Sequence, residues 1–179
     1  GLGGHYGAWV REQIGDDGIA ALTHTPRGRV CAATAVDWSL PTRLHSSVWS
    51  ADRAIDFLRR EGRDGPFCLA VSYSPPHCPY RQAPQAYLDM YPPDHIKLLP
   101  NATDSHWQSS DTMGRGPRPA DLSPDETDQR IRQTVAGYYS HVSALDACVG
   151  RLMDALDTLS LANDTLVVFT SDHGDMLGD

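Results

Sequence analysis

The feature that most constrains the fold is an apolar repeat over residues 123–159, which a β-branched segment follows closely. The run Ser123-Pro-Asp-Glu126 predicts a helix start, because serine and glutamate at this spacing form a capping box and proline suits the first turn. Apolar side chains then recur every three or four residues, at Ile131, Val135, Tyr138, Val142, Leu145, Val149, Leu152, Leu156 and Leu159. This spacing predicts one long amphipathic helix.

Two short apolar segments, at 66–73 and 165–171, each follow a predicted helix. The helix before the first segment is predicted over 42–62, because Val48, Ala51, Ile55 and Leu58 recur at three and four residues. Both segments are nearly unbroken apolar runs, and the second is rich in β-branched residues, as in strands buried on both faces. The alternation predicts an α/β fold with α/β/α layers and a mostly parallel sheet.

The remaining sequence gives weaker signals. The chain begins with several glycines, and residues 30–36 form an apolar run that predicts a further strand. Nine of the 13 prolines fall between Pro75 and Pro119, without helical or alternating periodicity. We therefore expect a single domain over 1–179 with a long Pro-rich loop at 74–122, and loops of this length are usually functional or mobile.

Composition excludes several classes of function. A formal net charge of −8 argues against binding to nucleic acid, which depends on Lys and Arg neutralising phosphates. No apolar run reaches the length of a membrane span. Cys31, Cys68, Cys78 and Cys148 form no CxxC pair, so neither a zinc knuckle nor a redox motif is predicted. The sequence does not indicate a compartment.

The first candidate site is Ser171-Asp-His-Gly-Asp175, directly after the second predicted strand. In open α/β sheets, ligands bind beyond the carboxyl ends of the strands. Asp172 and His173 can each give one ligand to a divalent cation, and Gly174 allows a sharp turn. The alternative is an acidic turn in which Asp172 caps a following helix.

The second candidate lies in Pro75-Pro-His77-Cys-Pro79, which ends the other predicted strand. His77 is therefore expected at the same edge of the sheet. Neighbouring prolines restrict its backbone, which suits a preset donor to an anionic oxygen. The alternative is an ordinary loop histidine.

Together these motifs resemble the sulfatase family of the alkaline-phosphatase superfamily. The resemblance runs from about residue 40 to residue 179. It rests on the Pro-His-x-Pro segment, on Gly137-Tyr-Tyr-Ser-His-Val-Ser-Ala-Leu-Asp146, and on the segment from Asn163 to Gly174. It implies that residues 1–179 form the middle part of a single catalytic domain with an incomplete alkaline-phosphatase-like fold.

The resemblance also implies a reaction, the hydrolysis of a sulfate ester on a small molecule or a glycan. Asp172 and His173 match a pair of metal ligands, usually for Ca2+ and in some relatives for Mn2+. His77 matches a histidine that hydrogen-bonds the sulfate ester, and a hydrated formylglycine attacks sulfur in the family's chemistry. Tyr138 and Asp146 are expected to brace the long helix.

The family's formylglycine motif, Cys-x-Pro-x-Arg, is headed by none of the four cysteines. Ser39-Leu-Pro-Thr-Arg43 matches the serine form, but no Thr-Gly follows it, and a helix start is the better interpretation. We expect these 179 residues alone to hold a partial site with little or no turnover. Three alternatives stay open: a phosphonate or phosphodiester hydrolase, a catalytically inactive domain that binds metal or a sulfated ligand, and a plain α/β domain.

Overall fold

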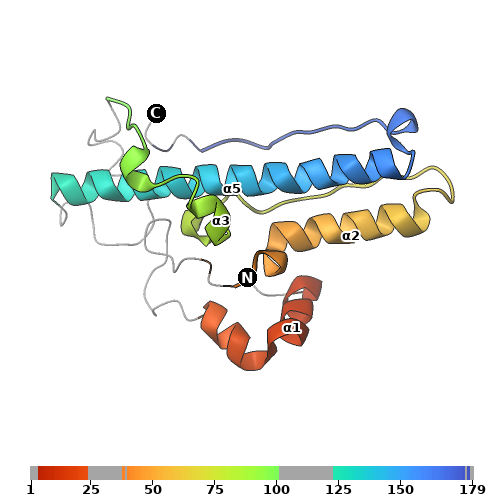
Figure 1. Ribbon diagram of the computed structural model, residues 1–179, viewed down its shortest axis with the longest axis horizontal. Helices are drawn as coiled ribbons and strands as arrows, with labels where there is room; N and C mark the ends of the chain where they lie inside the picture. Colours follow the sequence, from red (N-terminus) through yellow and green to blue (C-terminus); the bar gives the residue numbers. More distant parts are fainter. Residues whose placement is uncertain (1–3, 24–37, 39, 101–122, 176, 178–179) are drawn as a thin grey trace.

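The computed structural model describes residues 4–23, 38, 40–100, 123–175 and 177, and its framework is helical (Figure 1). The long helices are α1 (Gly4–Thr23), α2 (Ser46–Glu61) and α5 (Pro124–Thr158). The short elements are the one-turn helix α3 (Gln85–Leu88) and the 3-10 turns η1 (Thr42–Leu44), η2 (Tyr80–Gln82), η3 (Pro93–His95) and η6 (Ala162–Asp164). Helices α2 and α3 and the turns η2 and η3 all contact α5, which is the central element. None of the described helices has an apolar stretch long enough to span a bilayer.

Helix α5 begins as the sequence predicts. The Glu126 N–H donates to the side chain of Ser123, and the Ser123 N–H donates to the Glu126 carboxylate at 2.8 Å. These two bonds are the predicted capping box and satisfy two backbone donors at the helix start. The hydrogen bond from the Ser123 side chain also lowers the pKa of Glu126. The long amphipathic helix is therefore confirmed, although Val142 of the apolar repeat stays exposed.

Helix α2 confirms the helix predicted over 42–62, but it begins later. Residues Thr42–Leu44 form the separate turn η1, and His45 caps α2 by accepting the Ser47 N–H at Nδ1. Its apolar face is buried, as the spacing of Ala51, Ile55 and Leu58 predicts.

Helix α1 was not predicted, because glycines interrupt its sequence and Gly15 forms a kink with φ of 68°. It is fixed to the rest of the chain by the Tyr6 hydroxyl, which donates to the Leu44 carbonyl at 2.6 Å, and by fully buried Val10. The strand predicted at 30–36 lies outside the described residues.

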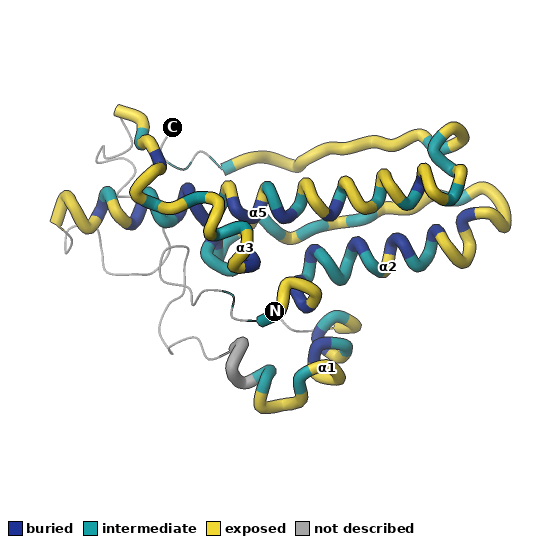
Figure 2. The backbone as a smooth tube through the Cα atoms, viewed as in Figure 1, coloured by how far each residue is buried: buried dark blue, intermediate teal, exposed yellow. Residues whose placement is uncertain are grey.

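The main difference from the sequence prediction concerns the two predicted buried strands. Residues 66–73 and 165–170 are extended, but the described part of the chain contains no paired strand. Both are largely exposed, with Leu166 at 89% and Phe169 at 75% (Figure 2). Strands gain their stability from neighbouring strands, and the described residues supply none. In Figure 1 the two segments nevertheless run in the same direction, each antiparallel to the helix before it.

The first part of the Pro-rich loop packs on α5. Ile96 forms a buried apolar cluster with Ile131, Val135 and Ala136 of α5, against which Tyr91, Leu98 and Leu177 pack. Residues 101–122 lie outside the described residues, so the single domain over 1–179 stays a prediction.

The closest contact in this packing is between η2 and α5 at Gly137. A Cβ atom at Gly137 would lie 2.4 Å from the carbonyl oxygen of Tyr80 and 2.7 Å from its carbonyl carbon. Both atoms are backbone, so a side chain cannot be accommodated by a change of rotamer. Gly137 therefore sets how near η2 lies to the helix.

We predict that Gly137→Ala lowers the free energy of unfolding by about 1–3 kcal/mol, because the methyl group pushes η2 away from α5. The matched control is Gly150→Ala, on the same helix, where a Cβ would meet nothing within 4 Å. This control should gain roughly 0.5–1 kcal/mol from helix propensity. Urea unfolding of both variants tests the contact, and equal effects of the two substitutions would contradict it.

Two buried histidines hold the backbone at both ends of η2. The rings of His45 and His141 lie 5.7 Å apart between α2 and α5. His141 Nε2 lies 3.4 Å from the Pro79 carbonyl, and His45 makes a backbone hydrogen bond to Gln82. Burial lowers the pKa of each histidine to about 4, and the charge of His141 lowers that of His45 further. Both rings are therefore neutral near pH 7.

We predict that stability falls as the pH drops from 6.5 toward 4. Because the pKa of each histidine is about 4 in the folded chain and 6.5 ordinarily, the folded chain binds fewer protons than the unfolded chain in this range. Neither histidine lowers the free energy of unfolding above pH 6.5. As the pH falls toward 4, the free energy of unfolding decreases by up to about 3 kcal/mol for each histidine.

His141→Gln keeps an N–H donor for Pro79 but cannot titrate, so its stability should depend less on pH. His5→Gln changes an exposed histidine and is the control. Thermal unfolding between pH 4 and 7 measures both variants. Parallel pH curves for His141→Gln and the unmutated chain would contradict the prediction.

Candidate functional site

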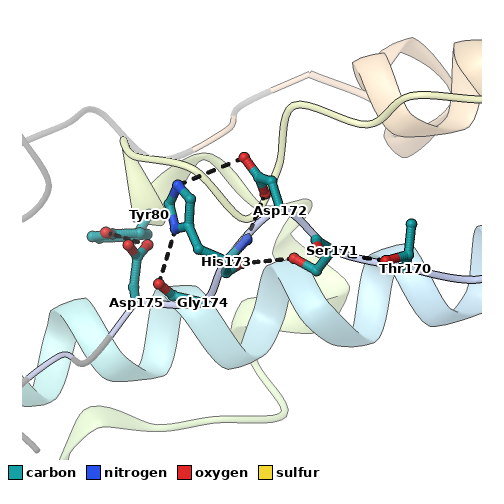
Figure 3. Close-up of polar contacts among 7 residues, drawn as sticks. All are labelled: Tyr80, Thr170, Ser171, Asp172, His173, Gly174 and Asp175. Atoms are coloured by element: carbon teal, nitrogen blue, oxygen red, sulfur yellow. Dashed lines mark hydrogen bonds and ion pairs between the residues drawn. The ribbon is translucent and has the colours of Figure 1, made fainter.

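Asp172 and His173 lie in a tight turn that follows the extended segment 165–170 (Figure 3). The His173 N–H donates to Asp172 Oδ1 at 2.9 Å, and the Ser171 hydroxyl donates to the His173 carbonyl at 2.6 Å. The Asp172 carboxylate thus binds the amide of its neighbour. The turn exposes both functional side chains to solvent.

The ring of His173 is oriented by a hydrogen bond within the same turn. Its Nδ1 lies 3.0 Å from the Gly174 carbonyl, which can only accept, so Nδ1 carries the proton. In the neutral ring, Nε2 then bears a lone pair, and it lies 3.6 Å from Asp172 Oδ2. Metal-binding histidines commonly donate their other ring N–H to a backbone carbonyl in this way. The two facing atoms have the arrangement of two ligands to one cation.

Asp172 and His173 each shift the pKa of the other toward the charged form. The pKa of Asp172 is lowered, first by the hydrogen bond from the His173 N–H and then by the charge of His173, with His77 adding to the effect. The pKa of His173 is raised, first by its hydrogen bond to Gly174 and then by the charge of Asp172. Asp172 is therefore ionised at neutral pH. A proton on His173 competes with a metal for Nε2.

His77 is held at the end of the other extended segment. Its N–H donates to the Ser74 carbonyl at 3.1 Å, and its Nδ1 donates to the Cys78 carbonyl at 2.8 Å. Nε2 is left for another partner, and the side chain is exposed. The charge of His77 also contributes to the lowered pKa of Asp172, so the two side chains lie within electrostatic range of each other.

Tyr80 and Asp175 join the two segment ends, and sequence reasoning singled out neither. The Tyr80 hydroxyl donates to Asp175 Oδ2 at 2.7 Å (Figure 3). The Tyr80 ring also packs edge-on against Tyr138, in keeping with the bracing role expected of Tyr138. Asp146 is exposed, and the described residues give it no hydrogen bond or ion pair that would support such a role.

The described residues form no cluster of three or more His, Cys, Asp or Glu side chains suited to a metal. The donor chemistry of Asp172 and His173 fits a divalent cation, but they supply two ligands at most. Ser39, the weak match to a nucleophile motif, lies outside the described residues.

Comparison with known proteins identifies the family. Residues 24–179 match the Sulfatase family, and the chain belongs to it. Membership implies the α/β fold of alkaline-phosphatase-like proteins, to which the helical framework corresponds in part. The family typically uses a divalent metal and acts on sulfate esters.

Individual relatives match most of the chain. It is 37% identical over 123 residues to an ulvan-active sulfatase of Formosa agariphila, which covers 68% of this chain and 20% of the relative. It is 33% identical over 143 residues to an arylsulfatase of Clostridium perfringens, covering 79% and 29%. It is 37% identical over 150 residues to the iduronate 2-sulfatase of Homo sapiens, covering 73% and 26%. The chain therefore spans less than a third of the length of these relatives.

We predict that Asp172→Asn lowers the pKa of His173, because the carboxylate that favours the imidazolium is removed. Asp175→Asn should lower the same pKa less, since its charge is the weaker influence. NMR titration of the His173 ring measures both variants. An unchanged His173 pKa in Asp172→Asn would show that the two side chains do not face each other in solution.

Proposed function

We propose that this chain carries part of the active site of a sulfate ester hydrolase. In this proposal, Asp172 and His173 are ligands of a divalent metal, and His77 is a hydrogen-bond donor to the sulfate group. The relatives are named for ulvan, aryl sulfates and iduronate, so the proposal extends to a small-molecule or glycan sulfate ester and names no single substrate.

The observation that carries the proposal is the 3.6 Å approach of His173 Nε2 to Asp172 Oδ2. With Nδ1 donating to Gly174, both facing atoms hold lone pairs, which repel unless a proton or a cation lies between them. A divalent cation relieves this repulsion and, when bound, neutralises negative charge on the ester oxygens. A proton on Nε2 would instead form an ion pair with Asp172. We infer a metal because the Sulfatase family typically uses one, and not a helix cap because no helix follows Asp172 among the described residues.

A carboxylate and an imidazole together can bind more than one divalent cation. We propose Ca2+, as the family resemblance suggests, with Mn2+ as the alternative. Carboxylate oxygen suits both cations, whereas an imidazole ligand is more typical of transition metals. Competition between Ca2+ and Mn2+ in isothermal titration calorimetry distinguishes the two.

His77 acts on the ester in this proposal. Its Nδ1 is occupied by the Cys78 carbonyl, so Nε2 is the atom that faces a ligand. When protonated, Nε2 donates to a negative oxygen of the sulfate and stabilises charge that develops during hydrolysis. The attacking group is not among the residues that we assign.

We predict that Asp172→Ala and His173→Ala lower metal affinity by at least roughly 10–100-fold in the intact protein. Calorimetry with CaCl2 and MnCl2 measures this loss directly. Unchanged metal content in both variants would contradict the metal site, and the Asp-His-Gly sequence would then be an ordinary turn.

We predict that His77→Ala in the intact protein lowers kcat for 4-nitrophenyl sulfate by about 10²–10³-fold without a comparable loss of metal affinity. His95→Ala, an exposed histidine of the same loop, should leave kcat unchanged. Faster hydrolysis of a phosphonate monoester by the unmutated protein would favour the phosphonate alternative. Metal binding without turnover of either substrate would favour an inactive binding domain.

A further inference from the structure

A hydrogen bond links the turn that holds Asp172 and His173 to a distant part of the described chain. The hydrogen bonds of Ser171, Asp172 and His173 stay within residues 170–174. Asp175 differs, because its carboxylate accepts from the hydroxyl of Tyr80, 95 residues earlier in the chain (Figure 3). This bond, together with the packing of Leu177 against the cluster of Ile96 and α5, holds the turn in position relative to His77.

Tyr80 is well suited to fix a position, because its surroundings hold it on several sides. It is 5% exposed, and its ring packs against Tyr138 at 5.9 Å between centroids. Its carbonyl group lies against Gly137, where no side chain intervenes. A hydroxyl held on such a base is a more precise anchor than one on a mobile side chain.

Both ends of the short turn that carries Tyr80 are also held. The Pro79 carbonyl lies 3.4 Å from His141 Nε2, and the backbone of Gln82 bonds His45. His77 lies three residues before Tyr80 on the same segment. A displacement of Tyr80 would therefore move His77 and Asp175 together.

We propose that Tyr80 is a positioning residue that sets the spacing between His77 and the Asp172–His173 pair by holding Asp175. This inference rests on the proposed function, since it assigns Tyr80 a role in a metal and sulfate site. Tyr80 touches neither the metal nor the ester in this role. It acts through Asp175, whose backbone continues directly from the ligand-bearing turn.

The test is Tyr80→Phe in the intact protein, which removes the hydroxyl and keeps the ring packing. Affinity for Mn2+ and Ca2+, measured by calorimetry, should fall about 10–100-fold, as for other groups that orient metal ligands. Activity toward 4-nitrophenyl sulfate should recover at saturating metal, and the melting temperature of the metal-free protein should change little. Loss of stability without loss of metal affinity would overturn the proposal, because that result indicates only a structural role.

Tyr138→Phe is the matched control, since Tyr138 packs on Tyr80 but makes no hydrogen bond to another described residue. Its metal affinity should equal that of the unmutated protein. Asp175→Ala removes the same bond together with a negative charge near His173, so its loss of affinity should be at least that of Tyr80→Phe, and the double variant should be no weaker than Asp175→Ala alone. Additive losses would overturn the proposal.

Metal binding by the unmutated protein and by Tyr80→Phe distinguishes failure of the proposed function from failure of the role of Tyr80. An unmutated protein that binds neither Mn2+ nor Ca2+ contradicts the proposed function, and the role of Tyr80 fails with it. An unmutated protein that binds metal, with equal affinity in Tyr80→Phe, contradicts the role of Tyr80 alone. In that case the assignment of Asp172 and His173 still stands.

Discussion

The contact of η2 with α5 at Gly137 is the constraint on which the candidate site depends. With 2.4 Å between a Cβ position and the Tyr80 carbonyl oxygen, only glycine permits this approach. Once the turn is seated there, Tyr80 reaches Asp175 and His77 lies at the near end of the same segment. A single missing side chain on a long helix thus locates residues from two distant parts of the sequence.

The same region combines two electrostatic environments. His45 and His141 are buried and kept neutral, so they hold η2 through hydrogen bonds without placing a charge inside the packing. Asp172 and His173, by contrast, lie in solvent and shift each other toward the charged forms. The buried histidines thus stabilise the fold in the neutral form, whereas the exposed His173 is shifted toward the charged form. The difference follows from burial, which disfavours the charged imidazolium.

Local signals made part of this fold predictable. The capping box at Ser123 and the apolar repeat depend only on residues close in sequence, so α5 follows from the pattern. The same holds for α2 after a small shift of its start. The extended segments 66–73 and 165–170 were recognised, but their burial depends on neighbouring strands and cannot be read from one segment.

Sequence motifs likewise predict only some of the site residues. Asp172, His173 and His77 stand at segment ends and belong to recognisable motifs, so sequence alone nominates them. The bond between Tyr80 and Asp175 spans 95 residues and has no periodic signal. It exists because α5 brings η2 and the final turn together, which only the three-dimensional arrangement reveals. Helix α1 was not predicted for another reason, because the kink at Gly15 interrupts its helical periodicity.

The exposed segment 165–170 has a consequence for handling the chain. Leu166, Val168 and Phe169 are uncharged, strongly exposed and free of proline, and their backbone groups have no partner strand among the described residues. Such a segment is a template for cross-β pairing between molecules. The formal net charge of −8 opposes that association by mutual repulsion, and added salt screens the repulsion. The tendency of the chain to associate through this segment should therefore increase with ionic strength.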